Sequence, residues 1–403
     1  MRNWARLAGG DFSDLTIDAL GALEGAGWRH GYRLAGEASA PDQDREPVLV
    51  AYAPPARMNK FQALLYARAH AHGAAVAPLS EPGHVANIVW PGPLVLHLHW
   101  VGNLVRDAAT RMEAEDRIGA FLSVLDAHRA TGGLLAWTAH NTLPHDSRDP
   151  ELDERLRREL TARCDGVHLM SEASGDILAE RFGLDLARSF VAPHPTYHGA
   201  YPDFAAREQA RLEVGVPPDA RVVLFFGSIQ RYKGLGLLRS AWEAVRDGAD
   251  DADGPPARLL VAGQPTDAGL ADELTAWAAG RLDAHVEAKK VPDDQVQYWF
   301  KSADCCVVPY TESLNSGVMM LALTFGVPVI APAIGAFAGL AGRGVTTYDP
   351  EEGADGLAAA LRAALRGDLA KVDNGALADR TPEAASDAFF GGLLGTLGLR
   401  GAR

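Results

Sequence analysis

The chain has 403 residues, of which 47% are hydrophobic and 22% are charged, as is ordinary for a soluble globular protein. This length exceeds what one ordinary hydrophobic core contains and predicts two domains. The formal net charge of −14 argues against non-specific binding to nucleic acid. No apolar run reaches the roughly 18 residues that a membrane-spanning helix needs, so we expect no transmembrane segment.

Strand-like apolar runs alternate with helical stretches in the first half of the chain. The runs lie at residues 47–52, 74–79, 94–100, 133–140, 166–170 and 189–193. The helical candidates lie at residues 15–25, 61–72, 108–130, 153–163 and 174–182. This alternation predicts an α/β domain with a mostly parallel sheet, which we place at residues 1–200.

The alternation stops at residues 194–204, which are rich in proline, glycine and aromatic residues, and then begins again. The strand candidates of the second half lie at residues 222–228, 259–265, 285–291, 305–309 and 328–331. We expect a second domain at 201–380 and a C-terminal helical segment at 381–403, which glycines divide into two helices. The predicted fold class is α/β, with two doubly wound Rossmann-like domains facing a central cleft.

The three cysteines, Cys164, Cys305 and Cys306, are too few for a disulfide framework in a chain of this size. Their apolar surroundings predict reduced thiols. The N-terminus lacks the long apolar centre of a signal peptide. We therefore expect a cytoplasmic protein, with peripheral contact to the inner face of a membrane left open.

A loop between two predicted strands ends in Asn315, Ser316 and Gly317, directly before a helix that begins near Val318. Ser316 is suited to cap this helix, and Gly317 lets a ligand approach the backbone closely. Free N–H groups and the helix dipole make such a helix start a site for an anion, for example a diphosphate. The alternative is an ordinary strand–loop–helix–strand unit with a good N-cap.

A second loop of this kind follows the apolar run at residues 222–226. Gly227 and Ser228 turn the chain, Arg231 and Lys233 supply positive charge, and a helix begins after Gly234. A glycine turn, a cation and a helix start together suit a phosphate group. The alternative is a solvated pair of cations, but two such helix starts in one domain favour a diphosphate site.

Two segments, FFGSIQRYKGLGLL and PYTESLNSGVMMLALTFGVPVIAP, resemble the donor-binding domain of GT-B glycosyltransferases of the bacterial group 1 (GT4-type) family. The resemblance covers most of residues 47–335 in order. It implies a hexosyltransferase whose C-terminal domain holds a nucleotide-sugar and whose N-terminal domain holds the acceptor. Lys233 matches the family's diphosphate lysine, and Ser316, Gly317 and Val318 match its backbone cradle.

This chain departs from the family pattern at two places in the donor site. The family has an arginine five residues before the lysine, where this chain has Ser228, and we hypothesise that Arg231 supplies the charge. The family also has two glutamates separated by seven residues, whose positions here are Ser313 and Leu321. Leu321 cannot hydrogen-bond a ribose, so donor recognition must differ. The candidates for binding ribose or the donor sugar are Glu312, Ser313 and Asn315.

In the first half, WTAHNTLPHD resembles the family's strand-histidine motif, and His140 matches the histidine near the donor sugar. A histidine titrates near neutral pH and can act as an acid or a base, so His140 is the catalytic candidate. The alternative is a histidine that caps a turn and is satisfied by the backbone.

The strand period of two places His97 and His99 on one face of a strand. Together with His140 and His145 they suggest a metal site as an alternative, because imidazole suits transition metals. The resemblance implies catalysis without a metal, and we expect one strand histidine to line the acceptor side and the other to be packed. The acceptor-side candidates are His99, Asn103, Asn141, Asn59 and Arg57.

We therefore predict a glycosyltransferase that moves a sugar from a nucleotide-sugar donor to the hydroxyl of a small-molecule or lipid-linked acceptor. The resemblance implies retention of configuration and no cofactor, because the nucleotide-sugar is a co-substrate. Two alternatives are a catalytically silent nucleotide-sugar binding protein and a GT-B nucleotide-sugar epimerase. The donor base, the sugar, the acceptor and the oligomeric state stay open.

Overall fold

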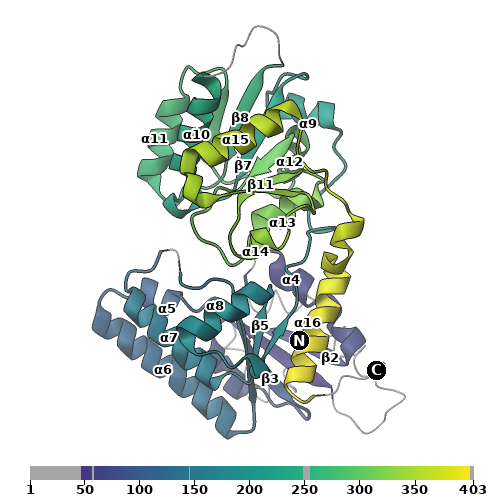
Figure 1. Cartoon of the computed structure of the whole chain (residues 1–403). Coiled ribbons are helices and arrows are strands. Elements are labelled where there is room, and N and C mark those ends of the chain that lie inside the picture. The colour runs from purple at the N-terminus through teal and green to yellow at the C-terminus, as the bar shows by residue number, and fades with distance from the viewer. Residues whose placement is uncertain (1–46, 57–58, 145, 248–254, 400–403) are drawn as a thin grey trace. The chain divides into compact units, whose positions relative to one another are not determined.

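The computed structural model describes residues 47–56, 59–144, 146–247 and 255–399. The chain divides into two compact units, which Figure 1 shows. The first unit contains Met1–Pro195 and Pro382–Arg403, and the second contains Thr196–Thr381. The helix predicted at residues 15–25 lies outside the described residues. Within the described part, no helix is both long and apolar enough to cross a membrane.

The first unit is built on a six-stranded parallel sheet in the order β2-β1-β3-β4-β5-β6. Every residue of β1 is buried, as expected for a parallel strand that is covered on both faces. All six strands coincide with predicted apolar runs. They are β1 (Val48–Ala53), β2 (Ala74–Pro78), β3 (Leu94–Leu98), β4 (Leu134–Thr138), β5 (Gly166–Leu169) and β6 (Ser189–Val191).

Helices cover both faces of this sheet, with α6, α7 and α8 on one side and α16 on the other (Figure 1). The short helices α4 and η2 pack against α16. The long helices are α6 (Arg111–Ala130), α7 (Pro150–Arg163), α8 (Glu172–Phe182) and α16 (Pro382–Thr396). The shorter ones are α4 (Phe61–Leu65), η2 (Ala69–His72), η3 (Pro82–Asn87), α5 (Asn103–Arg106) and η4 (Leu186–Arg188).

The helix predicted at residues 61–72 is broken into α4 and η2, and the break has a tertiary cause. The Ser386 hydroxyl of α16 donates to Leu65 O at 2.8 Å and accepts from Arg68 N at 3.0 Å. This side chain therefore occupies the backbone groups that a continuous helix would use itself. Arg68 also donates to Asp387 at 2.7 Å, which fixes the break against α16.

The C-terminal segment forms one continuous helix, α16, and not the two helices that its glycines suggested. Phe389, Phe390, Leu393 and Leu394 are buried in the core of the first unit together with side chains of β1. Gly392 lies so close to this unit that a Cβ would stand 2.3 Å from the Phe190 ring. This glycine therefore permits close packing of the helix rather than ending it.

The second unit contains another six-stranded parallel sheet, in the order β12-β11-β10-β7-β8-β9. Five of its strands coincide with predicted runs, whereas β12 was not predicted. The strands are β7 (Arg221–Phe226), β8 (Ala257–Ala262), β9 (Ala284–Glu287), β10 (Cys305–Val307), β11 (Val329–Pro332) and β12 (Val345–Tyr348).

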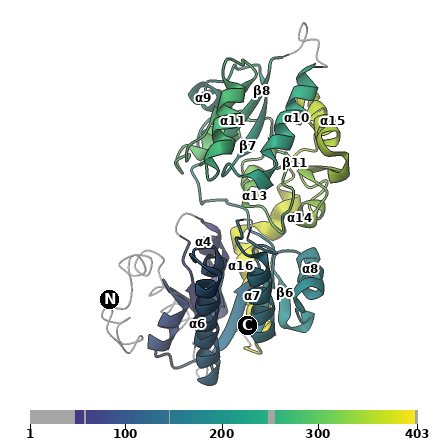
Figure 2. The same ribbon diagram turned by 90° about the vertical axis from the view of Figure 1, so that its left-hand side faces the viewer.

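The helices of the second unit pack on its sheet and on one another, and α10 lies beside α15 in both views (Figures 1 and 2). Another pair is α9 with α12. The α-helices are α9 (Arg207–Glu213), α10 (Leu235–Asp247), α11 (Ala268–Ala278), α12 (Val296–Ser302), α13 (Gly317–Thr324), α14 (Gly335–Ala338) and α15 (Gly353–Arg366). The 3₁₀ segments are η5 (Arg231–Lys233), η6 (Pro350–Glu352) and η7 (Gly375–Arg380).

The strand order reverses once in each sheet, which confirms the predicted doubly wound class. The reversal lies between β1 and β3 in the first unit and between β7 and β10 in the second. Ligands in such sheets bind beyond the carboxyl ends of the strands at this reversal. The two predicted phosphate loops follow β7 and β10, and therefore lie at the reversal of the second unit.

Candidate functional site

The loops that follow β7 and β10 contact each other through the backbone. Thr311 donates its N–H and its hydroxyl to Tyr232 O, at 3.0 and 3.1 Å. Gly234 has φ +70°, and a Cβ at this position would stand 1.8 Å from Pro309 O. Only glycine combines this left-handed backbone with so close an approach. The structure thus joins the two predicted phosphate loops into one surface.

Gly227 provides the second close approach between these loops. It follows β7 with φ +119°, and a Cβ there would lie 3.0 Å from Lys233 Nζ and 3.2 Å from Val318 Cγ2. Because Gly227 has no side chain, the Lys233 ammonium and the first turn of α13 both come close to it. The predicted cation and the predicted helix start therefore lie together.

Lys233 is buried, with 6% of its surface exposed. Burial lowers the pKa of its ammonium from 10.5 to about 8. Nζ lies 5.2 Å from the centre of the Tyr310 ring and 5.9 Å from that of Tyr232. Among the described residues, no carboxylate forms an ion pair with it. A buried cation without a counter-charge is costly, so this position favours an anionic ligand.

Ser316 is the N-cap of α13, as predicted, and its Oγ accepts from Met319 N at 3.1 Å. The bond from Met320 N to Ser316 O closes the first turn of the helix. The N–H groups of Gly317 and Val318 precede it and have no intrahelical acceptor. They are suited to donate to phosphate oxygens beside Lys233.

Arg231 and Ser228 have other partners in this structure. The Arg231 guanidinium is 68% exposed and pairs with Asp267 at 2.9 Å. Ser228 Oγ accepts from Gln230 Nε2 at 3.1 Å. Lys233 is therefore the cation that lies at the helix start, whereas the charge of Arg231 is directed to the N-cap of α11.

The ribose or sugar candidates lie in the loop before α13. Ser313 Oγ donates to Asn315 O at 2.6 Å and so stabilises the loop itself. Asn315 Nδ2 is buried without a hydrogen-bond partner, which leaves it able to donate to a ligand. Glu312 is exposed. Leu321 is buried in α13 and contributes to packing.

In the first unit, His140 is one end of a hydrogen-bonded network. His140 Nε2 lies 3.0 Å from His99 Nδ1. His99 Nε2 lies 2.7 Å from the Tyr66 hydroxyl, which also lies 2.6 Å from His97 Nδ1. His97 and His99 do lie on one face of β3 and its extension, as the period of two predicted.

The network continues across the sheet to its other end. His97 Nε2 lies 2.8 Å from Thr138 Oγ1, which lies 3.0 Å from His168 Nδ1. His168 Nε2 then lies 2.9 Å from Ala192 O. One continuous chain of contacts therefore connects His140 to a backbone carbonyl through five side chains.

Tyr66, Thr138 and His168 were missed by the sequence reasoning. Period two along β4 and β5 was a usable signal, because it places Thr138 and His168 on the same face as His97. Tyr66 had no such signal, since it follows α4 and reaches the strands only through the tertiary fold.

The ring of His140 is held by aromatic contacts and is half-buried. Trp100 stacks on it with ring centres 4.0 Å apart, and Phe61 contacts it edge-on at 5.2 Å. Burial, together with repulsion from neighbouring histidines and Arg157, lowers the pKa of His140 well below 6.5. It is therefore a neutral imidazole at neutral pH.

The structure places the other acceptor-side candidates in different environments. His99 is buried, with 1% exposure, and lies behind His140 instead of lining a binding surface. Asn59 Oδ1 accepts from Phe61 N at 3.0 Å, which supports the start of α4. Asn141 is half-buried next to His140 in the chain. Arg57 lies outside the described residues.

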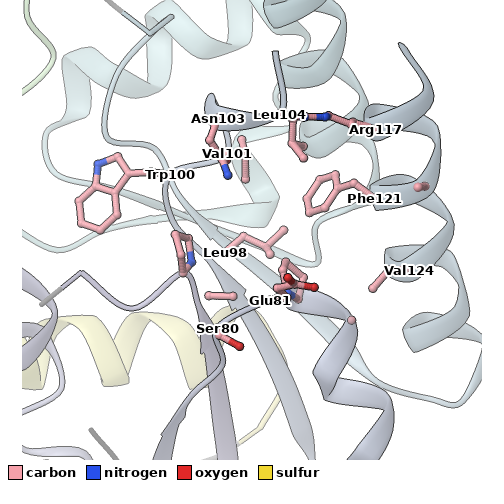
Figure 3. A pocket seen from close by; sticks show the side chains of 15 residues that line it. Ser80, Glu81, Leu98, Trp100, Val101, Asn103, Leu104, Arg117, Phe121 and Val124 are labelled. Atoms are coloured by element: carbon pink, nitrogen blue, oxygen red, sulfur yellow. The ribbon is translucent and has the colours of Figure 1, made fainter. Parts of the chain in front are cut away.

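A cavity of about 400 Å³ lies at the carboxyl ends of β1 and β3 (Figure 3). Its lining is mainly apolar and includes Leu98 of β3 and Phe121 of α6. Polar side chains are contributed by Glu81, Arg117 and Asn103. Asn103, an acceptor-side candidate, thus lies at a cavity that occupies the strand-order reversal of the first unit.

The histidine cluster does not form a metal site within the described part of the chain. No group of three or more His, Cys, Asp or Glu residues there has an arrangement that could hold a metal ion. The ring nitrogens of His97, His99 and His168 are occupied by the hydrogen bonds above. His145, a member of the suggested metal set, is outside the described residues.

Residues 220–366 match the family model described as glycosyl transferases group 1. The chain is 32% identical over 234 residues to D-inositol 3-phosphate glycosyltransferase 2 of Catenulispora acidiphila, covering 54% of this chain and 53% of that protein. It is 29% identical over 246 residues to a GDP-mannose:glycolipid 4-beta-D-mannosyltransferase of Xanthomonas campestris pv. campestris, covering 59% and 61%. The chain thus spans about half the length of the first of these relatives.

Solved structures show the same architecture. HepE of Anabaena in complex with UDP-glucose aligns with a TM-score of 0.60 and 13% identity over 86% of this chain and 99% of that one. An α,α-trehalose-phosphate synthase (UDP-forming) of Burkholderia vietnamiensis aligns with a TM-score of 0.58 and 12% identity, covering 89% and 100%. Residues 220–366 are therefore similar to the group 1 glycosyltransferases, and the chain has the GT-B fold.

Proposed function

We propose that this protein transfers a sugar from a nucleotide-sugar to an acceptor hydroxyl, with the diphosphate bound in the second unit. The observation that carries the proposal is the buried Lys233 ammonium beside the first turn of α13, which pairs with no carboxylate of the described residues. The family match over the same residues supports it, as does the UDP-glucose complex of the similar HepE structure.

The chemistry follows from charge. Breaking the bond between the sugar and the diphosphate develops negative charge on the leaving group. Lys233 and the N–H groups of Gly317 and Val318 are already oriented and stabilise that charge without reorganising. We propose that this suffices without a metal ion, and that the reaction retains configuration, so that no carboxylate base is needed.

We further propose that the cavity of the first unit receives part of the acceptor. Its apolar lining, with Leu98 and Phe121, suits an acceptor that carries an apolar group, whether a small molecule or a lipid-linked sugar. Glu81, Arg117 and Asn103 offer hydrogen bonds to its polar part. Pockets that combine an apolar lining with few polar groups are typical of small-molecule sites.

The first test is nucleotide binding by the full chain. We expect thermal stabilisation by at least one of UDP, GDP, dTDP or ADP or their sugars. Lys233→Met should weaken that binding at least about tenfold, because it removes a charged hydrogen bond worth about 1.5–3 kcal/mol. Lys371→Met makes the same charge change at an exposed site of the second unit and should bind normally.

Two outcomes would refute the donor site. One is the absence of stabilisation by every nucleotide in the panel. The other is unchanged affinity in Lys233→Met, which would remove this residue from the site.

A second candidate is a protein that binds a nucleotide-sugar without transferring it. The buried Leu321 and the internally bonded Ser313 favour it, because they stand where the family has two glutamates. Release of nucleoside diphosphate in the presence of an acceptor panel separates the two candidates. Tight binding with no release across acceptors would support the second.

A further inference from the structure

The network that ends at His140 has one consistent arrangement of protons. Its far end is Ala192 O, and a carbonyl oxygen can only accept. His168 Nε2 must therefore carry the proton that bridges their 2.9 Å contact. In a neutral imidazole the other nitrogen is then an acceptor, so Thr138 donates to His168 Nδ1.

The same direction of hydrogen-bond donation follows for every other contact of the network. The Thr138 hydroxyl has donated its only proton, so it accepts from His97 Nε2. His97 Nδ1 then accepts from the Tyr66 hydroxyl, whose oxygen accepts from His99 Nε2. Finally, His99 Nδ1 accepts from His140 Nε2.

This arrangement of protons requires neutral imidazoles, and the surroundings of the histidines keep them neutral. Burial disfavours the charged form, and it lowers the pKa of His168 to about 4 and that of His97 and His99 well below 6.5. Among the described residues, the charged and titratable groups that face His140 are further histidines and one arginine, none of which attracts a proton to it. They are His97, His99, His168, His194 and Arg157.

We propose that Tyr66, His97, His99, Thr138 and His168 are positioning residues that hold His140 in its Nε2–H tautomer and leave Nδ1 as a bare acceptor. Among the described residues, Nδ1 has no hydrogen-bond partner. His140 is the half-buried end of the network, whereas His97, His99 and His168 are buried. Of these four histidines, His140 is thus the one that is not fully buried, and its Nδ1 is the ring nitrogen that the network does not use.

This proposal deepens the proposed function and rests on it for its chemical meaning. A bare Nδ1 can accept a hydrogen bond from a hydroxyl of the donor sugar or the acceptor. It cannot donate to a leaving phosphate, so the network assigns His140 to hydroxyl recognition and leaves phosphate binding to the second unit.

The test is histidine side-chain nitrogen NMR on the full chain at neutral pH, without ligand. Correlations between ring protons and ¹⁵N nuclei distinguish the two neutral tautomers and the imidazolium, and His→Gln variants assign the signals. We expect the Nε2–H tautomer at all four of His97, His99, His140 and His168. An Nδ1–H tautomer or an imidazolium at His140 would overturn the proposal.

Variants test the coupling itself. Thr138→Val leaves the His97 Nε2 proton without an acceptor, so the reversed arrangement becomes accessible and His140 should show a mixture of tautomers. Thr138→Ser keeps the hydroxyl and should restore the single tautomer. A folded Thr138→Val protein with an unchanged His140 signal would show that no positioning occurs.

If Thr138→Val does not fold, Tyr66→Phe provides the same test, because it removes the hydroxyl between His97 and His99. A single Nε2–H tautomer at His140 in that variant would overturn the proposal. Nucleotide binding is measured separately, so failure of the donor site would leave these spectra unchanged, and the two failures are distinguishable.

Discussion

Lys233 is expected to make the unliganded protein less stable. Its pKa is lowered from 10.5 to about 8 by burial, so between these values the unfolded chain binds more protons than the folded one. Stability therefore rises with pH across this window, and below about pH 8 the folded protein bears the full cost. Since one pKa unit corresponds to about 1.4 kcal/mol, the cost is about 3 kcal/mol.

Replacing this residue should separate stability from binding. We expect Lys233→Met to raise the free energy of unfolding of the second unit by about 1–3 kcal/mol at pH 7, because a buried charge becomes an apolar side chain. The increase should shrink between pH 8 and 10.5. Urea denaturation followed by amide exchange in peptides of Thr196–Thr381 measures it, with Lys371→Met as the control. If Lys233→Met lowered the free energy of unfolding at pH 7, this would contradict the inference that the buried Lys233 ammonium destabilises the unliganded protein.

The residues of the proposed diphosphate site could be predicted from the sequence because each belongs to a local sequence pattern. Ser316 directly precedes an apolar helix, and Lys233 lies between a glycine turn and a helix start. The histidine network has no local pattern, since Tyr66, Thr138 and His168 come from three distant segments. Sequence periodicity predicts which side chains of a strand share a face, but it does not predict which residues of other segments they contact on that face.

At the scale of elements, Gly234, between η5 and α10, allows the two predicted phosphate loops, which follow β7 and β10, to pack against each other. Gly234→Ala places a Cβ 1.8 Å from Pro309 O and keeps a backbone with φ +70°. We expect a loss of about 2–4 kcal/mol in stability and a parallel loss of nucleotide affinity, because the second loop must move. Thermal denaturation and nucleotide titration measure the two effects.

The matched control for Gly234→Ala is Gly236→Ala, two residues further along the chain. At Gly236, inside α10, an added Cβ meets nothing within 4 Å. Gly236→Ala should therefore be neutral or stabilising by up to about 1 kcal/mol, with nucleotide binding retained. Equal behaviour of the two variants would show that the contact at Pro309 does not hold the site.

Helices and strands were predicted correctly where their own residues determine them. The helix predicted at residues 61–72 differs because of a contact with a distant segment. The parallel strands are continuous apolar runs, so β1 and β7 lie where the sequence indicated them. Residues 61–72 carry the signal of one helix, but Ser386, more than 300 residues away, occupies the backbone at its middle. No local reading of that segment contains this contact.

At the scale of the whole molecule, the last helix belongs to the first unit although the second unit lies between them in the sequence. The side chains of α16 complete the core over β1, and the ring of Phe389 stacks on His97 with centres 5.3 Å apart. The helix therefore covers the same face of the sheet that carries the histidine network. The first unit is consequently built from two segments of the chain that the second unit separates in the sequence.

Two adjacent glycines of α16 test whether its packing stabilises the first unit. At Gly392 an added Cβ would stand 2.3 Å from the Phe190 ring, whereas at Gly391 it would meet nothing within 4 Å. We expect Gly392→Ala to destabilise the first unit by about 1–3 kcal/mol through overpacking. Gly391→Ala should be neutral or slightly stabilising, because alanine favours the helix. Amide exchange reports the two units separately, and exchange within Thr196–Thr381 should not change in either variant. If the two alanines have equal effects in the first unit, then close packing of α16 on β6 does not stabilise it.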